Sequence, residues 1–381
     1  MAVDFSLSEE QELLRHEIRR FAEERILPGT RERDRTHTFP AELLREAGEM
    51  GLLGMLVGES YGGAGFDPLS YCLAVEEISR ICPSVGVTMS VSNSVCSWPI
   101  AKFGSEEIKR QFLPDLASGR KLGGFCLTEA GSGSDAGAML STARRDRDDY
   151  ILDGAKAWIT NAGVAGTFVV MAKTDPSAGK RGISAFVVDA ASPGIAIGAP
   201  EEKLGLRASV TAAVSFTACR VPARQMLGVE GGGFKIALAT LDHSRLGIAA
   251  QAVGMHQRAL DLALSYSRER VQFGVPIAEH QAIQFQLAKM STELAAARVL
   301  LWHAAAAERT PAAGRLAAEA KAFASEAANR AVWDSLQIHG GNGFCEEFEI
   351  ARLYRDVRVT TIYEGTSEMQ RLVIARHLLT S

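Results

Sequence analysis

The chain has 381 residues, more than a single hydrophobic core usually serves, so we expect two or three domains. Apolar residues make up 47% of it and charged residues 23%, a balance typical of globular proteins. The net charge of −4 argues against a nucleic-acid-binding protein, and the lack of a long apolar run argues against membrane insertion.

The spacing of cysteine and histidine favours neither a metal site nor a disulfide framework. None of the six cysteines forms a C-x-x-C pair, and none of the eight histidines belongs to an H-E-x-x-H motif. We therefore predict no metal, and chemistry based on carboxylates, hydroxyls or an organic cofactor. We also predict that the cysteines are buried, reduced thiols. They are Cys72, Cys82, Cys96, Cys126, Cys219 and Cys345.

The first third of the chain has a helical pattern. Ser8 and Gln11 have the spacing of a capping box, and apolar residues follow at helical spacing until Pro28. A glycine-rich loop occupies residues 61–65. Further helices are predicted at residues 70–81, 94–103 and 105–116.

Between about residue 123 and residue 222 the pattern changes to short alternating stretches bounded by Gly, Asp and Pro. Asp153-Gly154 predicts a hairpin turn inside residues 150–159. Other strands are predicted at 168–172, 183–188 and 210–216. Short strands without helices between them favour a barrel or sandwich over a Rossmann sheet.

From Gly233 the chain is again helical, with long Ala- and Leu-rich segments at 234–268, 279–307 and 311–338 and a last helix at 367–379. Long helices with short connections predict an up-down bundle. The predicted class is thus α+β with three domains. They comprise residues 1–121 (helical), 122–232 (β) and 233–381 (helical).

Two segments rich in glycine have both a structural and a functional interpretation. Residues 125–135, FCLTEAGSGSD, form either a surface turn or a loop whose N–H groups approach an anion or a flat ring. Residues 337–344, QIHGGNGF, lack the Gly-Lys-Ser/Thr of a Walker A loop. They form either a helix C-cap or a segment whose exposed backbone N–H groups bind a phosphate.

Two further segments carry candidate side chains. Trp158 follows the predicted hairpin and either packs in the core or flanks a planar cofactor. Glu364 lies between a strand-like apolar stretch and a Gly-Thr-Ser turn, with Thr366 or Ser367 as the N-cap of the last helix. It is either a first-turn residue that suits the helix dipole or a partly desolvated base.

In this order and over this α–β–α layout, the segments together resemble the acyl-CoA dehydrogenase family. "LTEAGSGSD", "WITNAG", "RVQFG", "QIHGGNGF" and "IYEGTSEMQRLVIARHLL" are similar to its signatures, and the resemblance runs from about residue 5 to residue 380. It implies a helical domain, a β-barrel domain and a C-terminal four-helix bundle. It also implies one FAD per subunit, a homotetramer built as a dimer of dimers, and an electron-transfer flavoprotein as electron acceptor.

The resemblance also implies residue roles. The flavin ring and ribityl chain would contact Phe125, Leu127, Thr128, Gly133, Ser134, Trp158, Ile159, Thr160, Thr366 and Ser367. The adenosine and pyrophosphate end would contact, in part across a subunit interface, Arg270, Gln281, Gln337, Ile338, His339, Gly340 and Gly341. The acyl-CoA substrate would contact Ser134, Asp242, His243, Ser244, Arg245, Gly365 and Trp98.

The reaction implied by the resemblance is α,β-dehydrogenation. Glu364 would take the α-proton while the β-hydride moves to the flavin, with the thioester oxygen polarised by the Glu364 backbone N–H and a ribityl hydroxyl. Some branches of the family carry their base on the helix of Asp242 and Arg245. Here the residues at that place are His243 and Ser244, and neither is a carboxylate.

Trp98 falls where the resemblance places the end of the acyl pocket, so it predicts a short or branched acyl chain, unless it packs in the helical core. The alternatives are an acyl-CoA oxidase, an enoyl-thioester reductase, an enzyme acting on acyl-carrier protein and, least favoured, a DNA-binding flavoprotein. The N-terminus has no secretory or transit-like leader, which favours a bacterial cytoplasm and leaves open a processed mitochondrial form.

Overall fold

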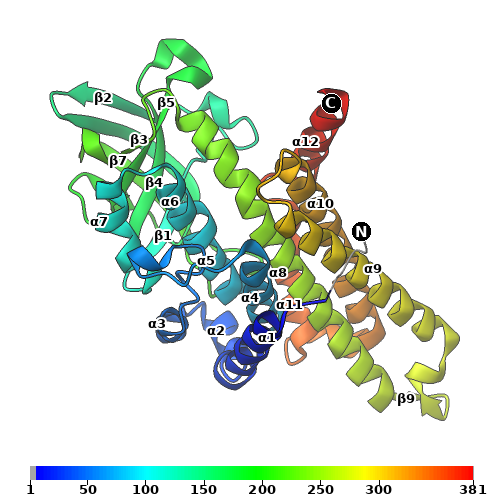
Figure 1. The fold of residues 1–381 in the computed structure, drawn as a ribbon. Helices are drawn as coiled ribbons and strands as arrows, with labels where there is room; N and C mark the ends of the chain where they lie inside the picture. Colours follow the sequence, from blue (N-terminus) through cyan, green and yellow to red (C-terminus); the bar gives the residue numbers. More distant parts are fainter. Residues whose placement is uncertain (1–5, 381) are drawn as a thin grey trace.

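The structure is a computed structural model, and it describes residues 6–380. Residues 1–5 of the predicted N-terminal domain and residue 381 of the predicted C-terminal domain lie outside the described residues. Helices, then a β region, then helices follow one another along the chain, which confirms the predicted fold class (Figure 1).

The N-terminal region is helical, as predicted. Helix α1 (Glu9–Phe21) begins with the capping box of Ser8 and Gln11, and a π-helical turn extends it to Ile26. The predicted helix at 94–103 is part of a longer helical stretch that starts at Pro83 and passes through a π-helical segment, Ser92–Ser97. The other helices are α2 (Thr30–Thr36), α3 (Ala41–Glu49), α4 (Pro68–Ile81), α5 (Pro83–Val91), α6 (Trp98–Phe103) and α7 (Glu106–Ala117).

The middle region is an eight-stranded sheet in the order β6-β7-β3-β2-β4-β5-β8, with β1 parallel to β4. Alternating apolar side chains of its strands, among them Phe168, Phe186 and Val214, form a core of its own. The strands are β1 (Leu122–Cys126), β2 (Thr142–Asp146), β3 (Asp149–Thr160), β4 (Ala165–Lys173), β5 (Ile183–Asp189), β6 (Ile195–Ile197), β7 (Thr211–Pro222) and β8 (Met226–Leu227).

The hairpin prediction at Asp153-Gly154 is wrong. Both residues lie inside β3, and the chain reverses earlier, between β2 and β3, where Arg147 has a φ of 58°. The pairing of β3 with β7 shifts register beside Gly154, whose φ is 145°. A Cβ there would lie 2.3 Å from Ser141 Oγ. Gly154 therefore allows a β-bulge and the close approach of Ser141, and it does not form a turn.

The C-terminal region is built on α8 (Gly233–Glu269), which runs from the sheet to the far end of the helical bundle (Figure 1). A large apolar cluster joins α8 to α4, α9 and α10, so this helix connects the N-terminal helices to the bundle. The other elements are α9 (Gln281–Ala306), α10 (Ala313–His339), α11 (Glu349–Val357), α12 (Ser367–Thr380) and a small hairpin of β9 (Val271–Gln272) and β10 (Val275–Pro276).

Candidate active site

Glu364 lies in a left-handed turn that connects the bundle to its last helix. The residues before it form a 3-10 helix, Arg358–Thr361, so the strand-like interpretation of this stretch is wrong. Glu364 has a φ of 52° and Gly365 a φ of 88°. A left-handed Glu is uncommon and persists only where its surroundings hold it. The positive φ at position 365 favours glycine, and a Cβ on Gly365 would lie 2.8 Å from Gln370 Nε2.

Three side chains hold this turn. Gln370 donates to the carbonyl of Glu364 at 3.2 Å and to that of Gly365 at 2.8 Å. Lys321 Nζ donates to the Gly365 carbonyl at 2.7 Å. Thr366 is the N-cap of α12, because its Oγ1 accepts from the N–H of Met369 at 3.4 Å. Glu364 is therefore not part of the helix, and the first-turn interpretation is wrong.

The Glu364 carboxylate is partly buried and has one direct hydrogen-bond donor. Ser244 Oγ, on α8, lies 2.6 Å from Glu364 Oε2. Burial raises the pKa of Glu364, while the Ser244 hydrogen bond and the charges of Lys321 and Arg245 act in the opposite direction. A carboxylate whose pKa is raised by burial is a stronger base, which suits it to take a proton from carbon.

The four consecutive residues predicted on α8 point to different neighbours. Ser244 faces Glu364, whereas Arg245 is buried and pairs with Asp242 one turn earlier. The His243 ring stacks on Trp98 with a centroid distance of 4.5 Å, and its Nδ1 lies 3.2 Å from a Glu308 carboxylate oxygen. The structure therefore brings Trp98 and His243 together, and brings Ser244 and Arg245 beside the base.

The two predicted flavin segments of the sheet lie side by side. The Ala157 N–H donates to the carbonyl of Thr128 at 2.9 Å, which joins residues 125–135 (the Gly-rich loop) to the end of β3. Trp158 has a φ of 61° and is 62% exposed, so the core interpretation of this residue is wrong. The side chain of Ile159 instead lies in the core of the sheet, which leaves only its backbone for a ligand contact.

A buried ion pair stabilises the Gly-rich loop. Lys156 Nζ lies 2.8 Å from Glu129 Oε1 and 3.2 Å from the Leu127 carbonyl. Glu129 also accepts from the Leu140 N–H and from both the N–H and the hydroxyl of Ser141. These contacts lower the pKa of Glu129 to about 2, against the effect of burial. Sequence analysis did not single out either charged residue of the pair.

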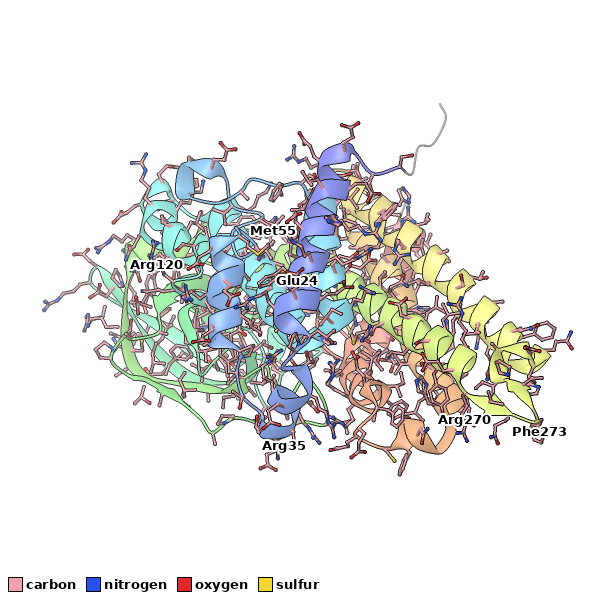
Figure 2. All side chains as sticks on the ribbon, turned by 90° about the horizontal axis from the view of Figure 1, so that it is seen from below. Glu24, Arg35, Met55, Arg120, Arg270 and Phe273 are labelled. Carbon is pink, nitrogen blue, oxygen red and sulfur yellow. The ribbon has the colours of Figure 1, made fainter. Side chains whose placement is uncertain are left out.

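The residues predicted at the adenosine end gather at the other end of the molecule. Arg270 caps the C-terminus of α8, and Figure 2 places it with Phe273 opposite Arg120, which precedes the sheet. Gln281 begins α9 nearby, and the His339 ring stacks on Tyr266 of α8 with a centroid distance of 4.3 Å. Within one chain, these residues are therefore not brought to the Gly-rich loop.

The residues present fit the proposed cofactor chemistry. Cβ atoms built on Gly131, Gly133, Gly340 and Gly341 would meet nothing within 4 Å, so their backbones are open to a ligand. The Ser367 hydroxyl is buried and finds no hydrogen-bond partner among the described residues. These open backbones, this hydroxyl and the exposed Trp158 ring are groups that a planar, phosphate-bearing molecule can contact.

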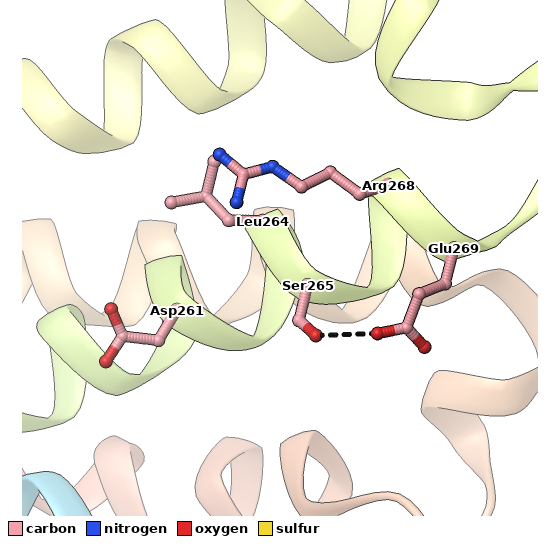
Figure 3. Close-up of a pocket in the computed structure, with 5 residues that line it drawn as sticks. All are labelled: Asp261, Leu264, Ser265, Arg268 and Glu269. Carbon is pink, nitrogen blue, oxygen red and sulfur yellow. Dashed lines mark hydrogen bonds between the residues drawn. The ribbon is translucent and has the colours of Figure 1, made fainter.

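Two pockets elsewhere in the described chain are lined by none of the predicted site residues. No group of three or more His, Cys, Asp or Glu side chains in residues 6–380 is arranged to hold a metal ion. A shallow pocket lies along the end of α8, but its lining (Asp261, Leu264, Ser265, Arg268 and Glu269) comes from one helix and includes no predicted site residue (Figure 3).

Five of the cysteines are buried thiols as predicted, but Cys345 is exposed. Over the part of the chain that the structure describes, no helix combines the length and the apolar character needed to cross a membrane.

Comparison with known proteins matches nearly the whole chain. Family models of the acyl-CoA dehydrogenase N-terminal, middle and C-terminal domains match residues 8–120, 124–219 and 231–379. The mitochondrial short-chain specific acyl-CoA dehydrogenase of Bos taurus is 50% identical over 376 residues, which cover 98% of this chain and 91% of that protein.

Two solved structures are similar over their full length. Butyryl-CoA dehydrogenase from Megasphaera elsdenii has a TM-score of 0.97 and 42% identity, with 99% of this chain and 100% of that chain covered. A chain from a structural study of the electron transferring flavoprotein of Acidaminococcus fermentans and flavin-based electron bifurcation has a TM-score of 0.98 and 44% identity, with 100% of both chains covered.

Proposed function

This chain belongs to the acyl-CoA dehydrogenase family, a family of flavin-dependent oxidoreductases, and from that premise we propose that Glu364 takes the α-proton of a short-chain acyl-CoA. The observation that carries the proposal is the Glu364 carboxylate itself. It is partly buried, has a raised pKa and is oriented by Ser244 at 2.6 Å. FAD, when bound, supplies the acceptor for the β-hydride.

The turn also offers a group that polarises the thioester. The Glu364 N–H makes no hydrogen bond to any other described residue, so it is available to a substrate oxygen. A backbone N–H directed at that oxygen stabilises the negative charge that develops as the α-proton leaves. The α-proton then moves to Glu364, and a bound acyl chain would exclude water from both groups.

FAD would be held by residues from both ends of the molecule. The Gly-rich loop, Trp158 and Ser367 would contact the isoalloxazine and ribityl portions, and the open glycines after α10 would receive the pyrophosphate. Arg270 would provide a charged partner to the same anion. Figure 2 shows Arg270 at the opposite end of the chain from Arg120, which directly precedes the sheet that carries the Gly-rich loop and Trp158, so we propose that a second copy completes each site.

The surface of the bundle supports assembly into the proposed homotetramer. The exposed large aromatic side chains of the C-terminal region include Phe273 (94%), Phe344 (87%), Phe285 (64%) and Trp333 (53%). Such exposed apolar groups mark surfaces that another protein covers. Light scattering of the FAD-bound protein should give the mass of four chains, and a monomer would contradict the shared site.

The base is tested by Glu364→Gln, which keeps the size of the side chain and removes its basicity. We expect FAD to remain bound with an unchanged absorbance spectrum, while turnover of butyryl-CoA falls by about 10⁴-fold. Glu368→Gln is the matched control, because Glu368 lies four residues later and is 76% exposed. Substantial turnover by the Glu364 variant would refute the assignment.

Substrate length and partner are tested with the native protein. Anaerobic titration with acyl-CoAs of increasing length should bleach the flavin band most strongly with short chains, as the names of the similar proteins from Bos taurus and Megasphaera elsdenii lead us to propose. An electron-transfer flavoprotein should then reoxidise the reduced protein. Bleaching by long chains alone would contradict the proposed substrate class.

A further inference from the structure

Lys321 is a charged residue in the middle of an alanine-rich helix. It lies on α10, and its side chain has no solvent exposure. Ala317, Ala320 and Ala324, around it on the same helix, are equally part of the core. A buried ammonium group is strongly unfavourable unless its charge is used by nearby acceptors and anions.

The ammonium group acts on the turn that carries Glu364. Its Nζ lies 2.7 Å from the carbonyl oxygen of Gly365, the residue that follows Glu364. Gln370 donates to the same oxygen at 2.8 Å. Two donors thus share one acceptor, and only one of them is charged. This difference separates an electrostatic role of Lys321 from a merely structural one.

The charge of Lys321 also reaches the Glu364 carboxylate through space. Each group stabilises the ionised form of the other, while burial lowers the pKa of Lys321 to about 8 and raises that of Glu364. Other charged and titratable groups act on this pair from α8, α4, α10, α12 and the turn itself. They are Arg245, with its partner Asp242, and Tyr71, Glu326, Glu368 and Tyr363.

We propose that Lys321 is a positioning residue of the reaction, whose buried ammonium keeps Glu364 ionised and holds its left-handed turn. The proposal rests on the function proposed above, in which Glu364 is the base. Below about pH 8 the Lys321 ammonium is charged, and its charge lowers the pKa of Glu364, which extends the pH range in which the carboxylate can accept a proton. Above that pH the amine loses its charge, and Arg245 remains as the cation that acts on the carboxylate.

Lys321→Met and Gln370→Met form a matched pair of variants. Both remove a donor to the Gly365 carbonyl, and only the first removes a charge. For Lys321→Met we expect the acidic limb of the kcat/KM profile with butyryl-CoA to move up by about one pH unit. Gln370→Met should leave the midpoint of that limb in place. Lys321→Arg, which keeps the charge, should restore the midpoint.

A direct titration provides a readout that does not depend on turnover or on the variants of Lys321. The infrared spectrum of the native protein, minus that of Glu364→Gln, isolates the Glu364 carboxylate band. We expect this band to shift as the pH passes through about 8, when Lys321 loses its proton. A band that stays constant through this range would overturn the proposal even if Lys321→Met does not fold.

The outcomes distinguish the two proposals. If Glu364→Gln is inactive but Lys321→Met and Gln370→Met give the same pH profile, Glu364 remains the base and the role of Lys321 is refuted. If Glu364→Gln retains turnover, the assignment of the base fails first. An upward shift with Lys321→Met alone supports the charge of Lys321 as the cause.

Discussion

The hydroxyl of Ser244 lies 2.6 Å from a carboxylate oxygen of Glu364, although 120 residues separate them in sequence. The bond links α8 to the turn before α12. Because α8 also packs against the sheet and the N-terminal helices, the position of the proposed base depends on the helix that connects all three regions. The hydrogen bond also stabilises the ionised carboxylate.

Replacement of Ser244 by Ala should therefore raise the pKa of Glu364. A hydrogen bond to a charged group contributes about 1.5–3 kcal/mol, which corresponds to an upward shift of about one to two pH units in the acidic limb of kcat/KM. The measurement is the pH profile with butyryl-CoA. Ser267→Ala is a control on the same helix, because its hydroxyl donates only to the Leu264 carbonyl at 3.1 Å. If the acidic limb of the kcat/KM profile has the same midpoint in Ser244→Ala and Ser267→Ala, the role of Ser244 is contradicted.

The ion pair of Glu129 and Lys156 should make the stability of the protein sensitive to acid. The pKa of Glu129 falls from the ordinary 4.5 to about 2 in the folded chain. The unfolded chain then binds a proton at a higher pH than the folded one. The stability from this carboxylate is therefore present above pH 4.5 and is lost as the pH falls from 4.5 towards 2.

Glu129→Gln tests this relationship. It leaves the buried Lys156 without an anion, so we expect the free energy of unfolding at pH 7 to drop by about 3 kcal/mol. The difference from the native protein should shrink as the pH falls below 4.5, as measured by urea denaturation at several pH values. Glu49→Gln, which breaks an exposed pair with Arg45, should change nothing measurable. A difference that does not depend on pH would count against the ion pair.

His256 should contribute a second, separate loss of stability in acid. Burial lowers the pKa of this ring to about 4, and its Nε2 lies 2.9 Å from the Met290 carbonyl. The unfolded chain binds a proton as the pH falls through 6.5, whereas the folded chain does so only near pH 4. Stability is therefore lost across this window, by about 3 kcal/mol. His256→Gln keeps a donor for Met290 and should flatten the pH dependence of Tm in this range; an unchanged slope would exclude His256 as its source.

Trp98 should limit the length of the acyl chain. Its ring stacks on His243 with an interplanar angle of 9°, and Phe103 meets it edge-on, so its position is well defined. Trp98→Ala should raise kcat/KM for octanoyl-CoA relative to butyryl-CoA by about tenfold or more, since each methylene contributes about 1 kcal/mol in an apolar pocket. Trp98→Phe should give an intermediate ratio. An unchanged ratio in both variants would assign Trp98 to packing alone.

Several predictions failed because the structure of a short segment depends on contacts that its own sequence pattern does not reveal. Asp153-Gly154 looks like a hairpin turn, but the glycine makes room for Ser141 at a bulge within one strand. The sequence pattern of the apolar stretch before Glu364 resembles that of a strand, but the residues form a 3-10 helix that precedes the turn. Of the two interpretations of Trp158, the core interpretation is the one that failed, because the residue is 62% exposed and has a left-handed backbone.

The sequence by itself determined the fold class, the family and the candidate base. Amphipathic periodicity is a local property of helices and strands, and the ordered signatures identify the family without any coordinates. Only the tertiary structure decided which groups act on Glu364. Ser244 and Lys321 lie 120 residues from Glu364 and 44 residues from Gly365, and each reaches the same turn from a different helix. A lone serine or lysine on a helix carries no local signal of that contact, since helix packing decides which side chains share a buried site.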